Sequence, residues 1–278
     1  MRSEAKKAFY FQANANSLGG FFEKPFQKVI PSQSSVSLPP SGGYVTSRTE
    51  AFNLDDVISC RSSHTRVSGN EVQTNGPWSV LITSVIEGLN ILNVVTAERI
   101  VAQISAEYPS DGGSPRIGLA GSHFQDLRIG GFLAYPALNR GLLQPKPGSD
   151  ASHSQLTWTN FQQTGREQAA RLIDSTKGDD QNASSWIAER FGWLNSDRKL
   201  EDGGYTLCSL VDGVDQAIPG RSFGHVVEIP DFGRIFLGEL LVTQTSIQIS
   251  MIRADLGCVH SATATAGSGV VGGHMVPP

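Results

Sequence analysis

Residues 78–131 read WSVLITSVIEGLNILNVVTAERIVAQISAEYPSDGGSPRIGLAGSHFQDLRIGG, and this stretch decides the fold class. Within it, Val80, Ile82 and Ile86 share one face of an alternating pattern. Residues 94–108 also show helical periodicity, but their many β-branched side chains favour a strand. Gly- and Asp-rich turns interrupt the stretch. It therefore predicts three or four β-strands joined by turns.

Both ends of the chain carry the same kind of pattern. Residues 8–15 alternate between apolar and polar side chains, and residues 225–257 predict a meander of three strands. In the last of these strands, residues 246–251 alternate as in a sheet with one face in water. The tail, residues 261–278, is rich in Gly, Ala and Thr. We expect it to be a closing strand, a flexible end, or an edge strand free to pair with another copy.

Residues 135–200 differ, because they predict a loop followed by helices. Thr164–Glu167 matches a capping box and predicts the start of a first helix. Ala183, Ile187 and Phe191 lie four residues apart and predict a second helix that ends at Gly192.

So few helical residues are not expected to form a core of their own. We therefore expect residues 1–134 and 201–278 to form one β domain, with residues 135–200 as a loop and helical insertion. The predicted fold class is mainly β, an antiparallel sandwich or roll-like domain with a short two-helix insertion.

Composition excludes several classes of protein. The chain has 278 residues, of which 39% are hydrophobic and 17% charged, so most of it is expected to fold. A net charge of −4 without a basic stripe argues against a nucleic-acid partner. No apolar run approaches the length of about 18 residues that a membrane-spanning helix needs, and no signal-peptide core is visible. No cofactor motif is found.

Three cysteines, Cys60, Cys208 and Cys258, are far apart in the sequence and form no zinc-binding spacing. Three buried thiols are the favoured interpretation, with one disulfide and one free thiol as the alternative. Cys258 and His260 would share one face of a strand and could begin a metal site, completed by Cys208 and His225. A buried cysteine beside a surface histidine is the preferred reading of that pair.

Four stretches in order resemble the bacterial choice-of-anchor P family: NSLGG with SVSLPPSGG (16–43), SVIEGLNILNVVTAERIVAQISA (84–106), GSHFQDLRIGG (121–131) and IPDFGRIFLGELLVTQTSIQISMIRADL (229–256). Together they cover most of the chain outside residues 135–200. The resemblance implies a β-rich protein that is exported and held at the cell surface by an anchor. It implies no catalytic residues.

The most enzyme-like motif is residues 220–224, GRSFG, which fits the nucleophile elbow of serine hydrolases around Ser222. Asp255 and His260 are the available triad partners. However, residues 225–229 predict a strand where the elbow requires a helix, so a serine hydrolase is only a remote alternative.

Trp158, Phe161, Trp186 and Trp193 cluster in or near the insertion and are the candidate binding residues. They predict either an aromatic platform for a glycan or partner, or anchors that pin the helices to the sheet, and anchoring is favoured. The leading functional hypothesis is a non-enzymatic structural or surface-associated protein that self-assembles through its β edges, so that its partner would be another copy, a surface partner or a glycan. The alternative is a carbohydrate- or ligand-binding β module.

Overall fold

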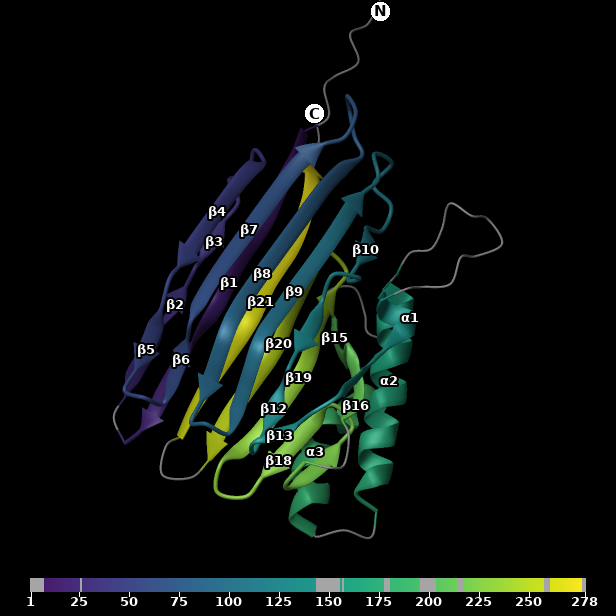
Figure 1. The fold of residues 1–278 in the computed structure, drawn as a ribbon. Coiled ribbons are helices and arrows are strands. Elements are labelled where there is room, and N and C mark those ends of the chain that lie inside the picture. Colours follow the sequence, from purple (N-terminus) through teal and green to yellow (C-terminus); the bar gives the residue numbers. More distant parts are fainter. Residues whose placement is uncertain are drawn as a thin grey trace, which may run out of the picture.

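The computed structural model describes residues 8–25, 27–143, 156, 158–177, 181–195, 204–214, 218–257 and 261–276 (Figure 1). Most of the elements are antiparallel strands, which confirms the predicted mainly β class. Two large sheets contain all but two of the strands. No helix in the described ranges is long and apolar enough to cross a membrane.

The first sheet draws its strands from the two ends of the chain. Its order is β17-β18-β19-β20-β21-β1-β2, with β15 also paired to β19 and β3 to β1. The bounds are β1 (Ala8–Lys24), β2 (Lys28–Gln33), β3 (Val36–Ser37), β15 (Tyr205–Ser209), β17 (Arg221–Phe223), β18 (Val226–Ile229), β19 (Gly233–Thr243), β20 (Ser246–Gly257) and β21 (Ser261–Val276).

The second sheet is built from the segment between those ends. Its order is β13-β12-β9-β8-β6-β5, while β7 joins β4 to β8, and β10 and β11 pair with β9. The bounds are β4 (Gly43–Thr49), β5 (Phe52–Leu54), β6 (Ile58–Cys60), β7 (Ser62–Glu71), β8 (Trp78–Ile91), β9 (Val95–Tyr108), β10 (Arg116–Gly118), β11 (His123–Gln125), β12 (Arg128–Ile129) and β13 (Phe132–Leu133). A separate two-stranded sheet contains β14 (Pro136–Leu138) and β16 (Val211–Val214).

The main core lies between the inner faces of the two large sheets. Leu18 and Ile249 of the first sheet and Ile82, Ile100 and Ile104 of the second are fully buried in one apolar cluster. The alternation seen in the sequence supplies these side chains, because every second residue of a strand faces the same side. Figure 1 shows β8 and β9 lying across β20 and β21.

The tail predicted from residues 261–278 is a central strand and not an edge. β21 pairs with β20 on one side and with β1 on the other along nearly its whole length. Its small residues have a packing role: a Cβ on Gly269 would lie 2.2 Å from Cδ1 of Ile82 in the facing sheet. Glycine here allows the two sheets to approach each other closely.

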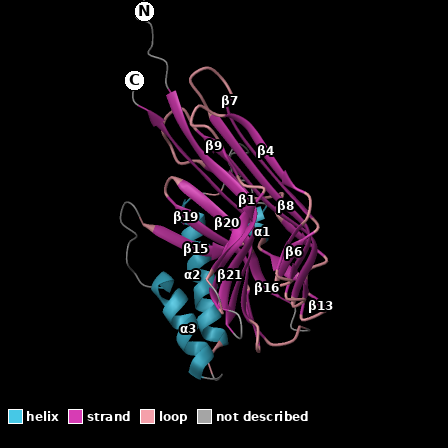
Figure 2. Cartoon of the chain, turned by 90° about the vertical axis from the view of Figure 1, so that its left-hand side faces the viewer, coloured by secondary structure: helices cyan, strands magenta, loops and turns pink. Residues whose placement is uncertain are grey.

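The helices cover part of the outer face of the first sheet. They are α1 (Arg140–Leu143), α2 (Trp158–Ser175) and α3 (Gln181–Phe191), followed by the 3₁₀ turn η1 (Gly192–Asn195). Figure 2 shows α2 and α3 together on one side of the molecule, beside β15. Side chains from α2, α3 and η1 pack with Phe223, Val226 and Phe236 in a second apolar cluster.

Two details of the predicted insertion need correction. It contains a third, four-residue helix, α1, in addition to the two expected. The capping-box prediction was also wrong, because α2 includes Trp158 and Thr164 lies in its interior. The buried face of α2 extends back to Phe161, so tertiary packing and not a local cap determines where the helix begins. The predicted second helix is confirmed as α3, which ends at Phe191.

Candidate functional site

The candidate site is a cavity of about 490 Å³ at one end of the two large sheets. Its walls come from the start of β1, the end of β9, the turn between β19 and β20, the end of β21, and the first turn of α2. The loop of residues 109–115 completes the lining. Cavities of about 300–1,000 Å³ are the usual size of small-molecule sites.

Two of the four predicted binding residues line this cavity. Trp158 and Phe161 lie one helical turn apart on α2. Phe161 is almost completely buried, whereas Trp158 is half-buried against the main core. The structure therefore brings this pair to the cavity wall.

The other two predicted residues lie elsewhere, against the second apolar cluster. Trp186 of α3 packs edge-on against Phe223 and Phe236, with ring centroids 6.4 Å apart in each case. Trp193 of η1 donates a hydrogen bond from Nε1 to the Arg190 carbonyl oxygen at 2.9 Å. These tryptophans join the helices to the sheet, and the four aromatic residues do not form one shared platform.

A group of aromatic rings from the strands forms the deep wall of the cavity. The Phe9 ring stacks on Trp78 at a centroid distance of 5.0 Å, and it contacts Tyr108 at 4.8 Å and Phe11 at 4.9 Å. A ring held by three neighbours has little freedom to move. The wall is therefore formed before any ligand enters.

The polar groups of the cavity are few and uncharged. The turn of residues 243–246 contributes its side chains at one side, and Ser114 and His274 are exposed at the opening. Thr243 Oγ1 accepts hydrogen bonds from the backbone N–H groups of Thr245 and Ser246, which fixes the shape of this turn. No Asp, Glu, Lys or Arg is among the described residues that line the cavity.

Tyr108 is the exceptional residue of this site. Its side chain is 6% exposed, and its buried hydroxyl has no hydrogen-bond partner among the residues that the structure describes. Burial raises the pKa of the Tyr108 phenol well above its ordinary value, so the group keeps its proton and remains a donor. Buried tyrosine hydroxyls usually find a partner.

Sequence reasoning missed Phe9 and Tyr108 as site residues. Both lie in strands that the alternation predicts, but pattern alone cannot show which inward residues reach the end of the core. The available signal was the place of Tyr108, an inward aromatic directly before the turn-rich sequence of residues 109–113.

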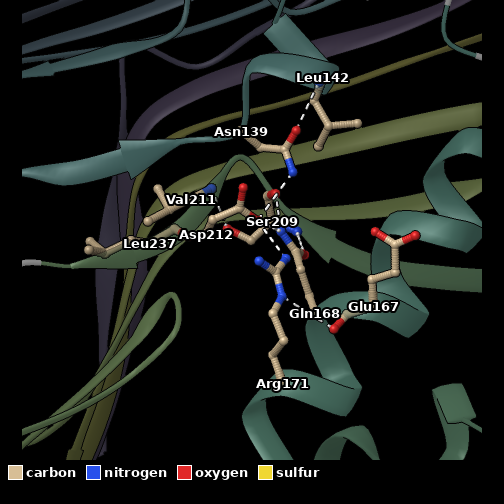
Figure 3. Close-up of polar contacts among 9 residues, drawn as sticks. All are labelled: Asn139, Leu142, Glu167, Gln168, Arg171, Ser209, Val211, Asp212 and Leu237. Carbon is tan, nitrogen blue, oxygen red and sulfur yellow. Dashed lines mark hydrogen bonds and ion pairs between the residues drawn. The ribbon is translucent and has the colours of Figure 1, made fainter.

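A polar network holds α2, and with it Trp158 and Phe161, against the sheet (Figure 3). Asp212 Oδ1 accepts hydrogen bonds from Asn139 Nδ2 at 3.2 Å, Gln168 Nε2 at 3.0 Å and an Arg171 guanidinium nitrogen at 2.9 Å. Gln168 also bonds the backbone of Ser209 through both its oxygen and its nitrogen. The polar groups of this network bond one another, so we interpret it as structural.

A second, ionic cluster lies beneath α3. Glu239 accepts hydrogen bonds from Arg190 at 2.9 Å and from Arg253 Nε at 2.8 Å, and both guanidiniums lie over the Phe236 ring. Burial alone would raise the pKa of Glu239, but the hydrogen bond from Arg253 and the two positive charges hold that pKa below its usual value. The carboxylate is therefore ionised and paired, as expected for a structural ion cluster.

The enzyme and metal hypotheses find little geometric support. Ser222 lies in strand β17, opposite Val227, and so is not in the strand-to-helix turn of a nucleophile elbow. Its proposed partner Asp255 is engaged by Arg253 and Thr263. His260 lies outside the described residues.

The cysteines are consistent with the favoured interpretation where they can be seen. Cys60 and Cys208 are buried free thiols, and Cys258 lies outside the described residues. Among the described residues, no group of three or more His, Cys, Asp and Glu side chains is arranged to hold a metal ion.

Comparison with known proteins places the chain by family but not by activity. No curated protein and no solved structure matches it. A family model described as "Domain of unknown function (DUF8256)" matches residues 9–243. That match includes both large sheets except for β20 and β21, together with the helices. The chain therefore belongs to the DUF8256 family.

Proposed function

We propose that this protein is a non-enzymatic β-sandwich-type module that binds a small molecule in the cavity at the end of its two sheets. The observation that carries the proposal is the preformed cavity of about 490 Å³, lined by aromatic side chains from two strands and a helix. Pockets with an apolar lining and a few placed polar groups are the default binding sites of folded proteins. The proposal develops the ligand-binding alternative raised by Trp158 and Phe161.

The scaffold around the cavity favours binding of a ligand in a fixed geometry. Phe9 is locked among aromatic rings, and α2 is tied down through Gln168 and Asp212. Walls that do not rearrange lose little entropy when a ligand binds.

Self-assembly and a cell-surface location stay predictions from the sequence. The tail that suggested edge pairing is occupied on both sides as β21, so assembly would have to use other edges. Within the described residues, β2 lies at one end of the first sheet, and its Val29 is 63% exposed. Light scattering would test assembly: a uniform monomer would argue against it, whereas Val29→Lys should dissociate an oligomer formed at this edge.

A substitution at the opening tests the binding proposal without disturbing the core. Ser114 is exposed and lines the cavity, so Ser114→Trp should fill the entrance while the protein remains folded. Ser41 is an exposed serine that does not line the cavity, and Ser41→Trp is the matched control. A library of uncharged aromatic compounds, sugars and carboxylates would be screened by thermal shift and by tryptophan fluorescence.

We expect compounds that stabilise the wild-type protein to lose this effect in Ser114→Trp and to keep it in Ser41→Trp. Binding that persists equally in Ser114→Trp would place the site elsewhere and overturn the proposal. So would a library without one compound that binds the wild-type protein.

A further inference from the structure

The unpartnered hydroxyl of Tyr108 restricts the chemistry of the ligand. An unpaired buried hydroxyl is costly in a folded protein, and native structures contain few such groups. Tyr108 lies at the end of β9, where its side chain contacts Phe9 and lines the cavity. A ligand atom that accepts a hydrogen bond would remove this cost on binding.

The charge of the lining restricts the ligand further. Every described side chain around the cavity is apolar or uncharged, apart from the exposed His274, which stacks on Tyr10. Placing a carboxylate, phosphate or sulfonate here would strip it of water without supplying an opposite charge, which is strongly unfavourable. Strongly cationic ligands are disfavoured for the same reason.

The distribution of polar groups distinguishes a mainly apolar ligand from a sugar. Phe9, Phe161, Ile247 and Val271 are buried and form an apolar interior, while the exposed polar side chains lie at the opening. A sugar ring has hydroxyl groups all around it and would leave most of them unpaired against such walls. An apolar body with a single acceptor matches the interior better.

We propose that the cavity binds an uncharged, mainly apolar molecule whose carbonyl, ether or hydroxyl oxygen accepts a hydrogen bond from Tyr108. This inference rests on the function proposed above and names its ligand class. Tyr108 then acts as the specificity-determining donor. The aromatic wall around Phe9 provides the apolar contact area, and the polar groups at the opening remain in water.

Three fluorescent probes with related ring systems test the charge and acceptor requirements separately. Phenylnaphthylamine is uncharged and has no carbonyl, anilinonaphthalenesulfonate adds a sulfonate to the same rings, and prodan is an uncharged naphthalene ketone. Each would be titrated into the full-length wild-type protein, into Tyr108→Phe, and into Tyr135→Phe. Tyr135 is 62% exposed and does not line the cavity, so it controls for loss of a tyrosine hydroxyl.

For the wild-type protein we expect both uncharged probes to bind about tenfold or more tightly than the sulfonate. Tyr108→Phe should weaken prodan binding by about three- to tenfold, the effect of one lost hydrogen bond, and leave phenylnaphthylamine unchanged. Tyr135→Phe should change neither. Because the hydroxyl has no partner in the free protein, Tyr108→Phe should not lower the urea midpoint of unfolding, whereas a merely structural hydroxyl would.

The outcomes separate this inference from the function on which it rests. Preferred binding of the sulfonate, or equal loss of both uncharged probes in Tyr108→Phe, would overturn the ligand class. If only a sugar such as maltotriose binds, and Ser114→Trp blocks it, the cavity is a binding site but the ligand class is wrong. Failure of every probe and every library compound would refute both proposals.

Discussion

Replacing His225 with glutamine should remove a large part of the pH dependence of folding. His225 is 3% exposed beneath α3, and burial lowers its pKa to about 4 from an ordinary 6.5. The Glu239 carboxylate opposes this shift, whereas the Arg190 and Arg253 guanidiniums add to it. The folded protein therefore keeps this imidazole neutral at pH values where the unfolded chain protonates it.

The size of the effect follows from the two pKa values. Above pH 6.5 both states leave His225 neutral, and its contribution to stability is fully present. Between pH 6.5 and about 4 the unfolded chain binds one more proton, so the free energy of unfolding falls by about 1.4 kcal/mol per pH unit. The loss reaches about 2 kcal/mol at about pH 5 and about 3 kcal/mol near the folded pKa.

Urea unfolding followed by tryptophan fluorescence at about pH 7.5 and about pH 5 would measure this loss. His225→Gln cannot take up the proton, so its stability should change by about 2 kcal/mol less than that of the wild-type protein over this range. His123→Gln is the control, because His123 is exposed and should retain the wild-type pH dependence. If His225→Gln shows the same pH dependence as the wild-type protein, the reasoning from burial is wrong.

Three other substitutions or reactions test the packing beneath the helices. Glu239→Gln should cost about 3–5 kcal/mol in urea unfolding because it leaves two arginines without their buried counter-charge; Glu228→Gln, at a more exposed ion pair, should cost less than about 1 kcal/mol, and equal losses would contradict this. Gly165→Ala should destabilise by about 1–3 kcal/mol, since its Cβ would lie 2.3 Å from the Leu207 carbonyl oxygen, whereas Gly192→Ala, which meets no neighbour within 4 Å, should be tolerated in the same assay. The Cys208 thiol is buried and its pKa is raised, so peptide mapping after brief iodoacetamide treatment should find it unmodified until the protein unfolds; rapid labelling of the folded protein would refute its burial.

Strand content was predictable because inward and outward side chains alternate in the sequence itself. The pattern of residues 78–108 became β8 and β9, and the meander of residues 225–257 became β18, β19 and β20. The sequence could not show that β21 would insert between β20 and β1, because pairing between strands far apart in the chain leaves no local pattern.

The candidate site was only half predictable, for a similar reason. Trp158 and Phe161 stood out as large aromatic residues in a polar insertion, which is a local signal. Tyr108 looked like any other inward residue of a strand, and only the complete fold shows that its hydroxyl lacks a partner. The start of α2 was missed because Phe161 packs against the main core, a contact that no cap motif encodes.

The pairing of β1 with β21 has a consequence for synthesis of the protein on the ribosome. Strands β4 to β13 come from one continuous segment, so their sheet can form while the chain is still being made. The other sheet must wait, because Ala8 pairs with Val276. Until the last strand emerges, the apolar face of β1 has no neighbour on that side, and the nascent protein exposes a surface that chaperones recognise. Completion of this fold is therefore a post-translational event.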